Sequence, residues 1–274
     1  MTESQIYASS LCLAVGSLSI LGWKWRISMR TVIPGALLIG GLTGVVAMLI
    51  NSKLVNLNIV GLIFIELFTI FVVVFILILV RFYRDPERLP LETGKVVLSP
   101  ADGTIIYVRA IENGSSIVST KGKRQFELTE ILGTELLCEA QFLVGIDMNI
   151  LNVHVNRSPI GGDVILQKRV EGKFLSLRRP ESETTNERLT TFIDNGQFRV
   201  AVIQIASRLV RRIVSYVKEG DRVGIGQRIG IIRFGSQVDL VIPRLANLAV
   251  MVKPGDQVKA GLSIIARYGW MDGS

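Results

Sequence analysis

The chain has 274 residues, a formal net charge of +8 at pH 7 and a hydrophobic content of 49%, which exceeds the norm for a globular domain and indicates membrane segments. Its two cysteines, Cys12 and Cys138, are too few for a disulfide framework or a thiolate metal site, and no metal ion is predicted. The positive charge suits an anionic surface. The membrane segments favour acidic phospholipid, and nucleic acid is not supported, since no zinc-finger, helix-turn-helix or aromatic-basic motif accompanies the charge.

Three long apolar runs occupy residues 6–23, 31–50 and 59–80. Each approaches or exceeds the ~20 residues that a helix needs to cross a bilayer. A signal peptide is the alternative for the first run, but no basic stretch precedes it and no small-residue cleavage site follows it. The sequence therefore predicts a membrane anchor of about three transmembrane helices over residues 1–82. Glu66 is the acidic interruption of the third run, and no role is assigned to it.

The basic residues near the ends of these runs are distributed unevenly. They are Lys24, Arg26, Arg30, Lys53, Arg81, Arg84 and Arg88. Only Lys53 follows the second run, whereas three basic residues follow each of the others. Because loops rich in lysine and arginine stay in the cytoplasm, we expect a multi-pass protein of the cell membrane with its soluble domain in the cytoplasm.

Residues 83–274 alternate apolar and charged positions, as a soluble domain does. A charged segment with two prolines, at 84–90, ends the last helix. Short β-branched segments separated by Gly, Asn or Asp turns follow it. These segments are 96–98, 104–108, 117–119, 164–167, 198–205 and 229–232. Helical pattern is weak and confined to 183–189 and 206–210. The predicted fold is a mostly β (α+β) domain.

Three short stretches carry candidate catalytic groups. Asp102 lies in a predicted turn, where backbone hydrogen bonding alone would explain it. His154 is the single histidine of the chain. A structural histidine is the commoner case, but an unperturbed pKa of ~6.5 suits acid–base work near neutrality. Gly235 and Ser236 lie between two apolar runs in what is by itself an ordinary turn. There a strained Gly-Ser bond could be attacked by the serine hydroxyl once a base removed its proton.

An internal repeat surrounds that turn. VKEGDRVGIGQRIG at 217–230 recurs as VKPGDQVKAGLSII at 252–265, and each copy predicts a strand, a Gly-Asp turn and a second strand. Two copies predict a quasi-symmetric, barrel-sandwich-like unit, similar to the halves of biotinyl and lipoyl carrier domains. Those domains present a lysine at the tip joining the halves, whereas this chain presents Ser236.

Hydroxyl, imidazole and carboxylate are the parts of a nucleophile triad, but spacing alone leaves open whether they meet. The sequence around them resembles the phosphatidylserine decarboxylase family, in particular its short, membrane-anchored form, which includes archaetidylserine decarboxylase-like members. The resemblance covers nearly the whole soluble part. It runs through RDPER at 84–88, SPADG at 99–103, NVHVNRSP at 152–159, GKF at 172–174, NER at 186–188, QIA at 204–206, RRI at 211–213 and RFGS at 233–236.

This resemblance implies a proenzyme, residues 83–274 of which form the decarboxylase domain, that cleaves itself between Gly235 and Ser236. Ser236 would become an amino-terminal pyruvoyl group, so that no added cofactor is needed. Asp102 would orient the imidazole, His154 would take the hydroxyl proton, and Ser236 would attack the Gly235 carbonyl. The pyruvoyl carbonyl would then act as the electron sink for loss of carbon dioxide from a serine phospholipid, giving the ethanolamine type. The cleaved chains would remain together as a heterodimer.

Two positions depart from the family's pattern: Gln237 stands where Arg or Thr is common, and Asn152 where many members have Asp. The three apolar runs also exceed the one or two expected. Arg157, Arg211 and Arg212 are candidate binders of the substrate's phosphate or carboxylate, although a basic face against lipid explains them as well. The choice between diacyl and archaeal ether lipid stays open, as does any oligomer beyond the heterodimer.

A non-enzymatic alternative is a membrane-anchored barrel-sandwich adaptor or carrier-like module in which the Gly235 turn is merely structural. The repeat alone allows either interpretation. The set of motifs, found in order along the chain, favours the enzyme.

Overall fold

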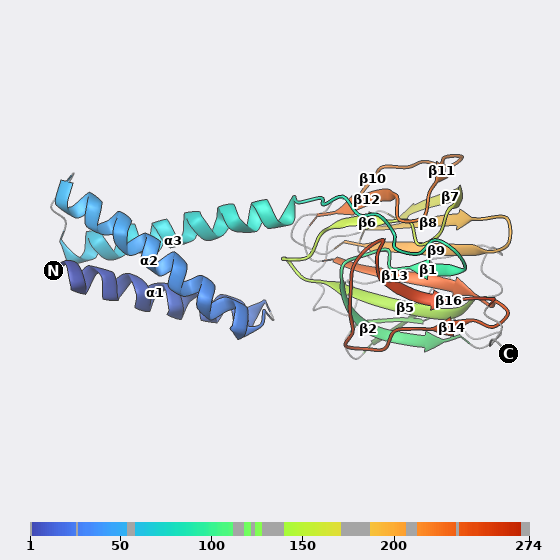
Figure 1. The fold of residues 1–274 in the computed structure, drawn as a ribbon, viewed down its shortest axis with the longest axis horizontal. Coiled ribbons are helices and arrows are strands. Elements are labelled where there is room, and N and C mark those ends of the chain that lie inside the picture. The colour runs from blue at the N-terminus through green and yellow to red at the C-terminus, as the bar shows by residue number, and fades with distance from the viewer. Residues whose placement is uncertain are drawn as a thin grey trace. The chain divides into compact units, whose positions relative to one another are not determined.

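The computed structural model describes residues 2–25, 27–53, 58–111, 118–121, 124–127, 140–170, 187–206, 213–233 and 236–269. The chain divides into two compact units, Met1–Phe82 and Tyr83–Ser274. The described part of the first unit is helical, and that of the second is built from strands (Figure 1).

Three helices make up the described part of the first unit: α1 (Glu3–Lys24), α2 (Met29–Lys53) and α3 (Ile59–Phe82). Each is long and apolar enough to cross a membrane, in agreement with the three predicted runs. Glycines let α1 and α2 approach closely. A Cβ at Gly40 would lie 3.0 Å from the Cα of Leu11, and one at Gly44 would lie 2.8 Å from the ring of Tyr7. Small residues of this kind give membrane helices their packing contacts.

Glu66 is fully buried within the helical unit, at 0% exposure. Its carboxyl oxygens accept hydrogen bonds from Ser9 Oγ at 2.8 and 3.0 Å and from Ser10 Oγ at 2.7 Å, and both serines belong to α1. A carboxyl group in hydrocarbon is costly unless it is hydrogen-bonded, so these contacts join α3 to α1.

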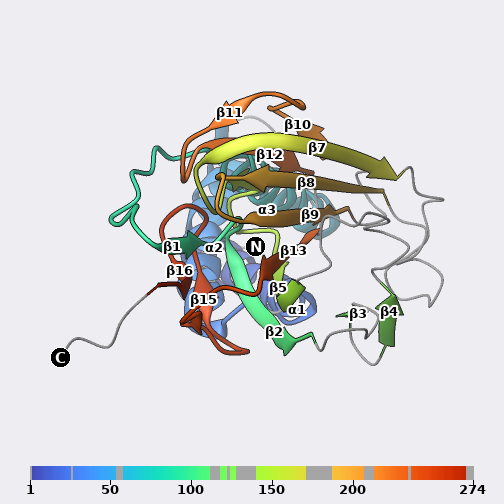
Figure 2. The same cartoon turned by 90° about the vertical axis from the view of Figure 1, so that its right-hand side faces the viewer.

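The second unit is dominated by an eight-stranded antiparallel sheet of order β11-β7-β8-β9-β13-β5-β2-β15. Its strands are β2 (Gly103–Ala110), β5 (Ala140–Met148), β7 (Gly162–Val170), β8 (Arg188–Asp194), β9 (Arg199–Ile205), β11 (Arg222–Val223), β13 (Ser236–Pro243) and β15 (Gln257–Val258). The sheet is strongly curled, as Figure 2 shows. Strand β13 lies near its centre, antiparallel to both β5 and β9.

Smaller sheets complete the described part of this unit. One has the order β1-β16-β14, the second has the order β10-β12-β6, and the third pairs β3 with β4. Their bounds are β1 (Val96–Leu98), β3 (Val118–Lys121), β4 (Arg124–Glu127), β6 (Val155–Arg157), β10 (Ile213–Ser215), β12 (Arg228–Ile232), β14 (Ala249–Val250) and β16 (Ile264–Arg267). The main core lies between the large sheet and the sheets β1-β16-β14 and β10-β12-β6, where Val238 and Leu240 of β13 join a cluster that includes Ile232 and Ile265.

The two copies of the predicted repeat make the same backbone hydrogen bonds. Gly220 N donates to Val164 O and Gly255 N donates to Ile105 O, each at 2.8 Å, and the two glycines have φ of 88° and 98°. The copies pair with other strands and not with each other, and β11 and β15 form the two edges of the large sheet. The strand-turn-strand repeat is therefore present, while the barrel-sandwich arrangement stays a prediction.

Every predicted β segment overlaps an observed strand in its described residues. The helix predicted at 183–189 is wrong where the structure describes it, because Arg188 and Leu189 belong to β8. Leu189 is buried in the main core, so packing in the sheet overrides the weak helical pattern. Residues 183–186 and 207–210 lie outside the described residues.

The Glu66 contacts yield a stability prediction for the helical unit. Replacing Ser9 and Ser10 together by alanine removes the described hydrogen-bond donors to the carboxyl group and should lower the free energy of unfolding by ~1–2 kcal/mol. Tryptophan fluorescence of the purified protein in detergent would measure the loss. Ser52→Ala at the exposed end of α2 is the control. Equal stability of the double variant and the control would show that these contacts do not hold the helices.

Candidate active site

The connection that carries the predicted cleavage site joins two sheets. Strand β12 ends at Ile232 in a three-stranded sheet, and β13 begins at Ser236 in the eight-stranded one. The predicted short connection is present, but its two strands do not form a hairpin. Gly235 lies outside the described residues, and the description of Ser236 is limited to its backbone.

The backbone register places Ser236 opposite the end of β5. Its Cα pairs with that of Met148, and the next residue, Gln237, pairs with Asp147 on one side and Ile205 on the other. Gln237, Val238 and Asp239 are all buried. The start of β13 is therefore held within the sheet on both sides.

His154 lies directly before β6 and is bonded to the strand that leads into the connection, because its carbonyl accepts a hydrogen bond from Ile232 N at 3.2 Å. Its side chain is buried, at 0% exposure. The Nδ1 atom lies 2.9 Å from the carbonyl oxygen of Asn152. Since a carbonyl oxygen only accepts, Nδ1 must carry the proton, which leaves Nε2 as the basic nitrogen of the neutral ring.

Burial lowers the pKa of His154 to about 4, while the hydrogen bond to Asn152 and the negative charge of Asp102 act in the opposite direction. Removing the ring from water penalises the charged imidazolium, and that penalty exceeds the two favourable contributions. The imidazole is therefore neutral at physiological pH, and its Nε2 carries no proton.

Asp102, in the turn after β1, is nearly buried at 5% exposure. Its Oδ1 and Oδ2 accept hydrogen bonds from Arg88 at 2.5 and 2.9 Å, and Oδ1 also accepts one from Ala260 N at 2.8 Å. The sequence predicted that Asp102 orients the imidazole, but the structure gives the Nδ1 hydrogen bond to the carbonyl of Asn152. A guanidinium offers two charge-assisted hydrogen bonds, which favours its pairing with this carboxylate. The negative charge of Asp102 raises the pKa of His154, as the smallest of the three contributions to that pKa.

The two loops that carry these residues are tied to each other. Leu98 N donates to Pro159 O, and Arg157 N donates to Pro100 O, each at 2.9 Å. These bonds join the Ser-Pro turn before Asp102 to the Ser-Pro turn after His154. The structure thus brings the two predicted residues into one region although they are far apart in sequence.

A buried amide pair that sequence reasoning missed lies beside this region. Gln204 Nε2 donates to Asn156 Oδ1 at 2.8 Å, and Asn156 Nδ2 lies 3.9 Å from the sulfur of Met148, the residue paired with Ser236. The signal in the sequence was the position of both amides within the motifs NVHVNRSP and QIA. They help to pack the His154 segment against the strands that hold Ser236.

Gln237, which departs from the family's pattern, is buried with a polar cluster. Its Nε2 donates to Tyr107 Oη at 2.9 Å and to Asp239 Oδ1 at 2.8 Å, and Tyr107 Oη donates to Asp239 Oδ2 at 2.8 Å. Because residues 237 and 239 share one face of the strand, this cluster anchors the start of β13.

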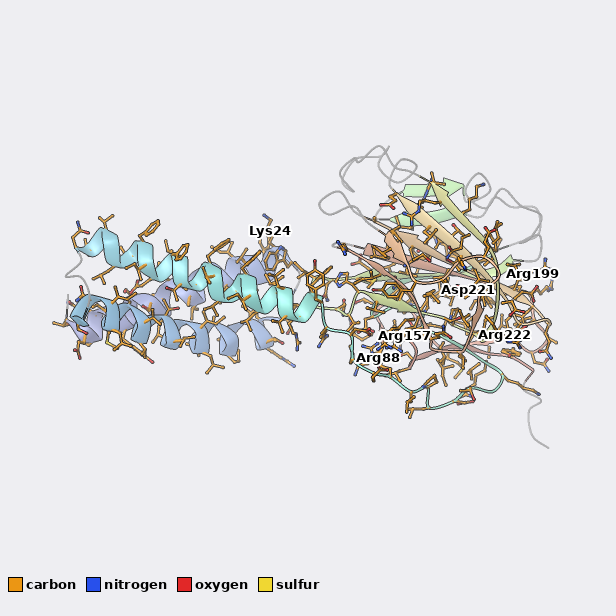
Figure 3. The ribbon with its side chains drawn as sticks, turned by 90° about the horizontal axis from the view of Figure 1, so that it is seen from above. Lys24, Arg88, Arg157, Arg199, Asp221 and Arg222 are labelled. Carbon is orange, nitrogen blue, oxygen red and sulfur yellow. The ribbon has the colours of Figure 1, made fainter. Side chains whose placement is uncertain are left out.

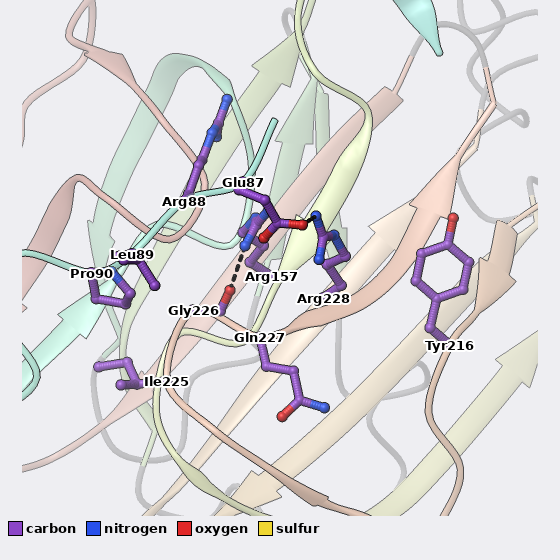
Figure 4. A pocket seen from close by; sticks show the side chains of 10 residues that line it. All are labelled: Glu87, Arg88, Leu89, Pro90, Arg157, Tyr216, Ile225, Gly226, Gln227 and Arg228. Atoms are coloured by element: carbon purple, nitrogen blue, oxygen red, sulfur yellow. Dashed lines mark hydrogen bonds and ion pairs between the residues drawn. The ribbon is translucent and has the colours of Figure 1, made fainter. Parts of the chain in front are cut away.

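Arg157 is buried at 3% exposure and donates hydrogen bonds to Gly226 O at 3.0 Å and Pro86 O at 2.9 Å. It lies on the same side of the second unit as Arg88 (Figure 3). Both line a pocket of about 510 Å³ that Figure 4 shows. The pocket is lined by Glu87, Arg88, Leu89, Pro90, Arg157, Tyr216, Ile225, Gly226, Gln227 and Arg228. Substrate binding by Arg157 stays a prediction, and Arg211 and Arg212 lie outside the described residues. Within the described ranges, no group of three His, Cys, Asp or Glu residues is placed to hold a metal ion.

The sequence is similar to a known protein family and to several relatives from archaea and bacteria. The model of the family described as phosphatidylserine decarboxylase matches residues 75–266. A relative from Methanocaldococcus jannaschii, provisionally named an archaetidylserine decarboxylase proenzyme, is 40% identical over 202 residues, which cover 73% of this chain and 95% of the relative. The phosphatidylserine decarboxylase proenzyme of Chlorobium chlorochromatii is 38% identical over 199 residues, covering 72% and 82%. That of Symbiobacterium thermophilum is 40% identical over 188 residues, covering 68% and 77%.

The protonation of His154 can be measured directly, because a chain with one histidine gives one imidazole signal in nuclear magnetic resonance. The signal should titrate with a midpoint near 4. In Asp102→Asn the midpoint should move lower still, since the charge that favours the imidazolium is gone. A midpoint near the ordinary value of ~6.5 would show that the ring is not buried as described.

The same shift makes folding stability depend on pH. The unfolded chain binds a proton at His154 below pH ~6.5, whereas the folded chain resists it down to about 4, so the free energy of unfolding should fall as pH falls through that window, by ~3 kcal/mol in all. In His154→Ala this part of the pH dependence should be absent.

Proposed function

Because the chain belongs to the phosphatidylserine decarboxylase family, we propose that it converts a phosphatidylserine-type phospholipid to the phosphatidylethanolamine type, releasing carbon dioxide, with a pyruvoyl group made from its own Ser236. Membership of the family makes the chain a carboxy-lyase. The substrate and the self-processing are the finer part of the proposal, and the proenzyme names of the relatives support them.

The observation that carries the proposal is the position of Ser236 at the junction of two sheets. Strands β12 and β13 do not pair with each other, so a cut before Ser236 breaks no strand pairing. The new amino terminus would stay fixed by β5 and β9, and the strand before the cut would stay fixed by β6 and β10. The strand pairings on both sides of Ser236 therefore suit a pyruvoyl group at position 236, which must stay in place after the chain is cut.

Self-processing would use groups that the chain itself supplies. Neutral His154 accepts the hydroxyl proton of Ser236, whose oxygen attacks the Gly235 carbonyl carbon and takes the place of the amide nitrogen. Elimination from the resulting ester frees the carboxylate of Gly235 and leaves dehydroalanine at position 236. Water then releases ammonia and leaves the pyruvoyl carbonyl. Asp102 stabilises the imidazolium that forms when His154 holds the proton.

Once present, the pyruvoyl group supplies an electron sink for the pair of electrons left behind when the substrate carboxylate departs as carbon dioxide. His154 is the group that we expect to return a proton to the substrate carbon. The relatives carry names of both diacyl and archaeal lipid enzymes, so the proposal rests on the phosphoserine head group that the two lipid classes share.

The proposed partners are the membrane, the serine phospholipid and the second fragment of the same chain. Three apolar helices support attachment to a membrane. We propose in addition that they are true spans, that the catalytic domain faces the cytoplasm, and that the two fragments form a heterodimer.

Processing is tested by purifying the wild-type protein and Ser236→Ala. Wild type should give one chain ending at Gly235 and one starting at residue 236, and it should release carbon dioxide from a serine phospholipid in mixed micelles. Ser236→Ala should remain one inactive chain, and the control Ser263→Ala should behave as wild type. A wild-type protein that stays full length while decarboxylating lipid would remove the mechanism.

His154→Ala should cleave ~10²–10⁴-fold more slowly than wild type, because a general base is worth about that much. A time course on a denaturing gel measures the rate. Cleavage at the wild-type rate would return His154 to a structural role.

Topology follows from the charges between the apolar runs. A protease site appended after Ser274 should be cut from the cytoplasmic side only, in inverted vesicles but not in intact cells. Cutting from the outside alone would require the opposite orientation or an even number of spans.

A further inference from the structure

The segment at 84–92, which we name the exit segment, is joined to strands β12 and β16 of the second unit by ion pairs. Arg228 of β12 lies 2.6 Å from Asp85 and 2.6 Å from Glu87, and Arg267 of β16 makes a two-point pair with Glu92. The family match begins at residue 75 and so includes this segment. The exit segment is therefore part of the matched domain and more than a link to the helices.

One pair of this segment differs from the others in burial. The side chains of Arg88 and Asp102 are 8% and 7% exposed, whereas those of Arg267 and Glu92 are 26% and 39% exposed. The guanidinium of Arg88 donates hydrogen bonds to both carboxylate oxygens of Asp102, at 2.5 and 2.9 Å. It donates a further hydrogen bond to Ala260 O at 2.9 Å. Because Ala260 N donates to the same carboxylate, the three residues form a closed ring of hydrogen bonds.

Burying this ion pair adds little stability to the attachment of the loop. Burying both charges of an ion pair costs much of what their attraction returns, and apolar side chains of similar volume often stabilise as well. The more exposed pairs at Asp85, Glu87 and Glu92 already fasten the exit segment. The buried pair also fixes the orientation of the Asp102 carboxylate. The turn that carries Asp102 is joined to the His154 segment by the hydrogen bonds from Leu98 N to Pro159 O and from Arg157 N to Pro100 O. The negative charge of Asp102 raises the pKa of His154.

We propose that Arg88 is a positioning residue for self-cleavage, holding the Asp102 carboxylate in one orientation so that its negative charge stabilises His154 when the imidazole takes the proton of Ser236. This inference rests on the proposed function. It makes the exit segment, which follows directly on the last helix, a working part of the catalytic domain.

A set of conservative variants separates this role from simple docking of the segment. Arg88→Lys keeps the positive charge but loses the planar fork that grips both oxygens. Misplacing Asp102 by a fraction of an ångström to an ångström should slow self-cleavage by roughly 10–10²-fold. The matched control is Arg267→Lys, which weakens the other two-point pair of the exit segment and should cleave at the wild-type rate.

A double-mutant cycle then asks whether Arg88 acts through Asp102. If it does, the protein with both Arg88→Lys and Asp102→Asn should cleave no more slowly than the one with Asp102→Asn alone. Multiplying effects in the double variant, or equal slowing by Arg88→Lys and Arg267→Lys, would overturn the proposal and leave Arg88 as a docking residue. Thermal unfolding of each variant, followed before cleavage is assayed, shows whether the domain is folded.

A second readout does not depend on cleavage. In the uncut Ser236→Ala protein, adding Arg88→Lys should move the titration midpoint of the His154 imidazole signal, whereas adding Arg267→Lys should leave it unchanged. An unchanged midpoint in both would refute the coupling between Arg88, Asp102 and His154. If wild type itself never cleaves, the proposed function fails, and the imidazole titration still decides whether Arg88 controls the charge that His154 feels.

Discussion

The pairing of strand β13 on both of its sides is the constraint on which the rest of the account depends. From Gln237 onward this strand is hydrogen-bonded to β5 and β9, while the strand that precedes it, β12, is committed to a different sheet. A chain that must break at this point and keep both ends in place needs such an arrangement. The buried cluster of Gln237, Tyr107 and Asp239 fixes the start of β13 still further.

The electrostatics of the region follow from burial. A histidine removed from water is neutral near pH 7 and can serve as a base, but the same burial opposes the imidazolium that it becomes. A negative charge nearby offsets that cost in part, and an unpaired buried carboxylate would itself be costly. Arg88 pairs with Asp102 and so offsets the cost of burying that carboxylate. The ring of His154 is oriented by its hydrogen bond to the carbonyl of Asn152, while Asp102 contributes a nearby negative charge.

Much of this arrangement could be predicted from the sequence, for identifiable physical reasons. The three apolar helices follow from apolar length alone, and the turns of the repeat follow from Gly220 and Gly255, which need positive φ. The motifs NVHVNRSP and RFGS led to the prediction that His154 and Ser236 have chemical roles, and those roles stay a prediction. The strand at Leu189 was missed because burial in a sheet outweighs local helical pattern.

The partners of Asp102 could not be predicted in the same way. Arg88 precedes it in a segment that reads as a charged linker, and Ala260 belongs to the second copy of the repeat, so only the packed structure brings them together. The buried pair of Asn156 and Gln204 was hidden for the same reason, because an amide gives no sign in the sequence of whether it faces water or another amide.

The central claim is that Ser236 becomes the amino-terminal group on which decarboxylation depends, and the intact mass of the purified polypeptides tests it most directly. The account predicts a carboxy-terminal fragment that begins at residue 236 and is lighter by one ammonia than the same fragment with a free serine, because conversion to pyruvoyl releases that ammonia. A preparation that decarboxylates serine phospholipid but contains only the full-length chain, or a fragment beginning with unmodified serine, would contradict it.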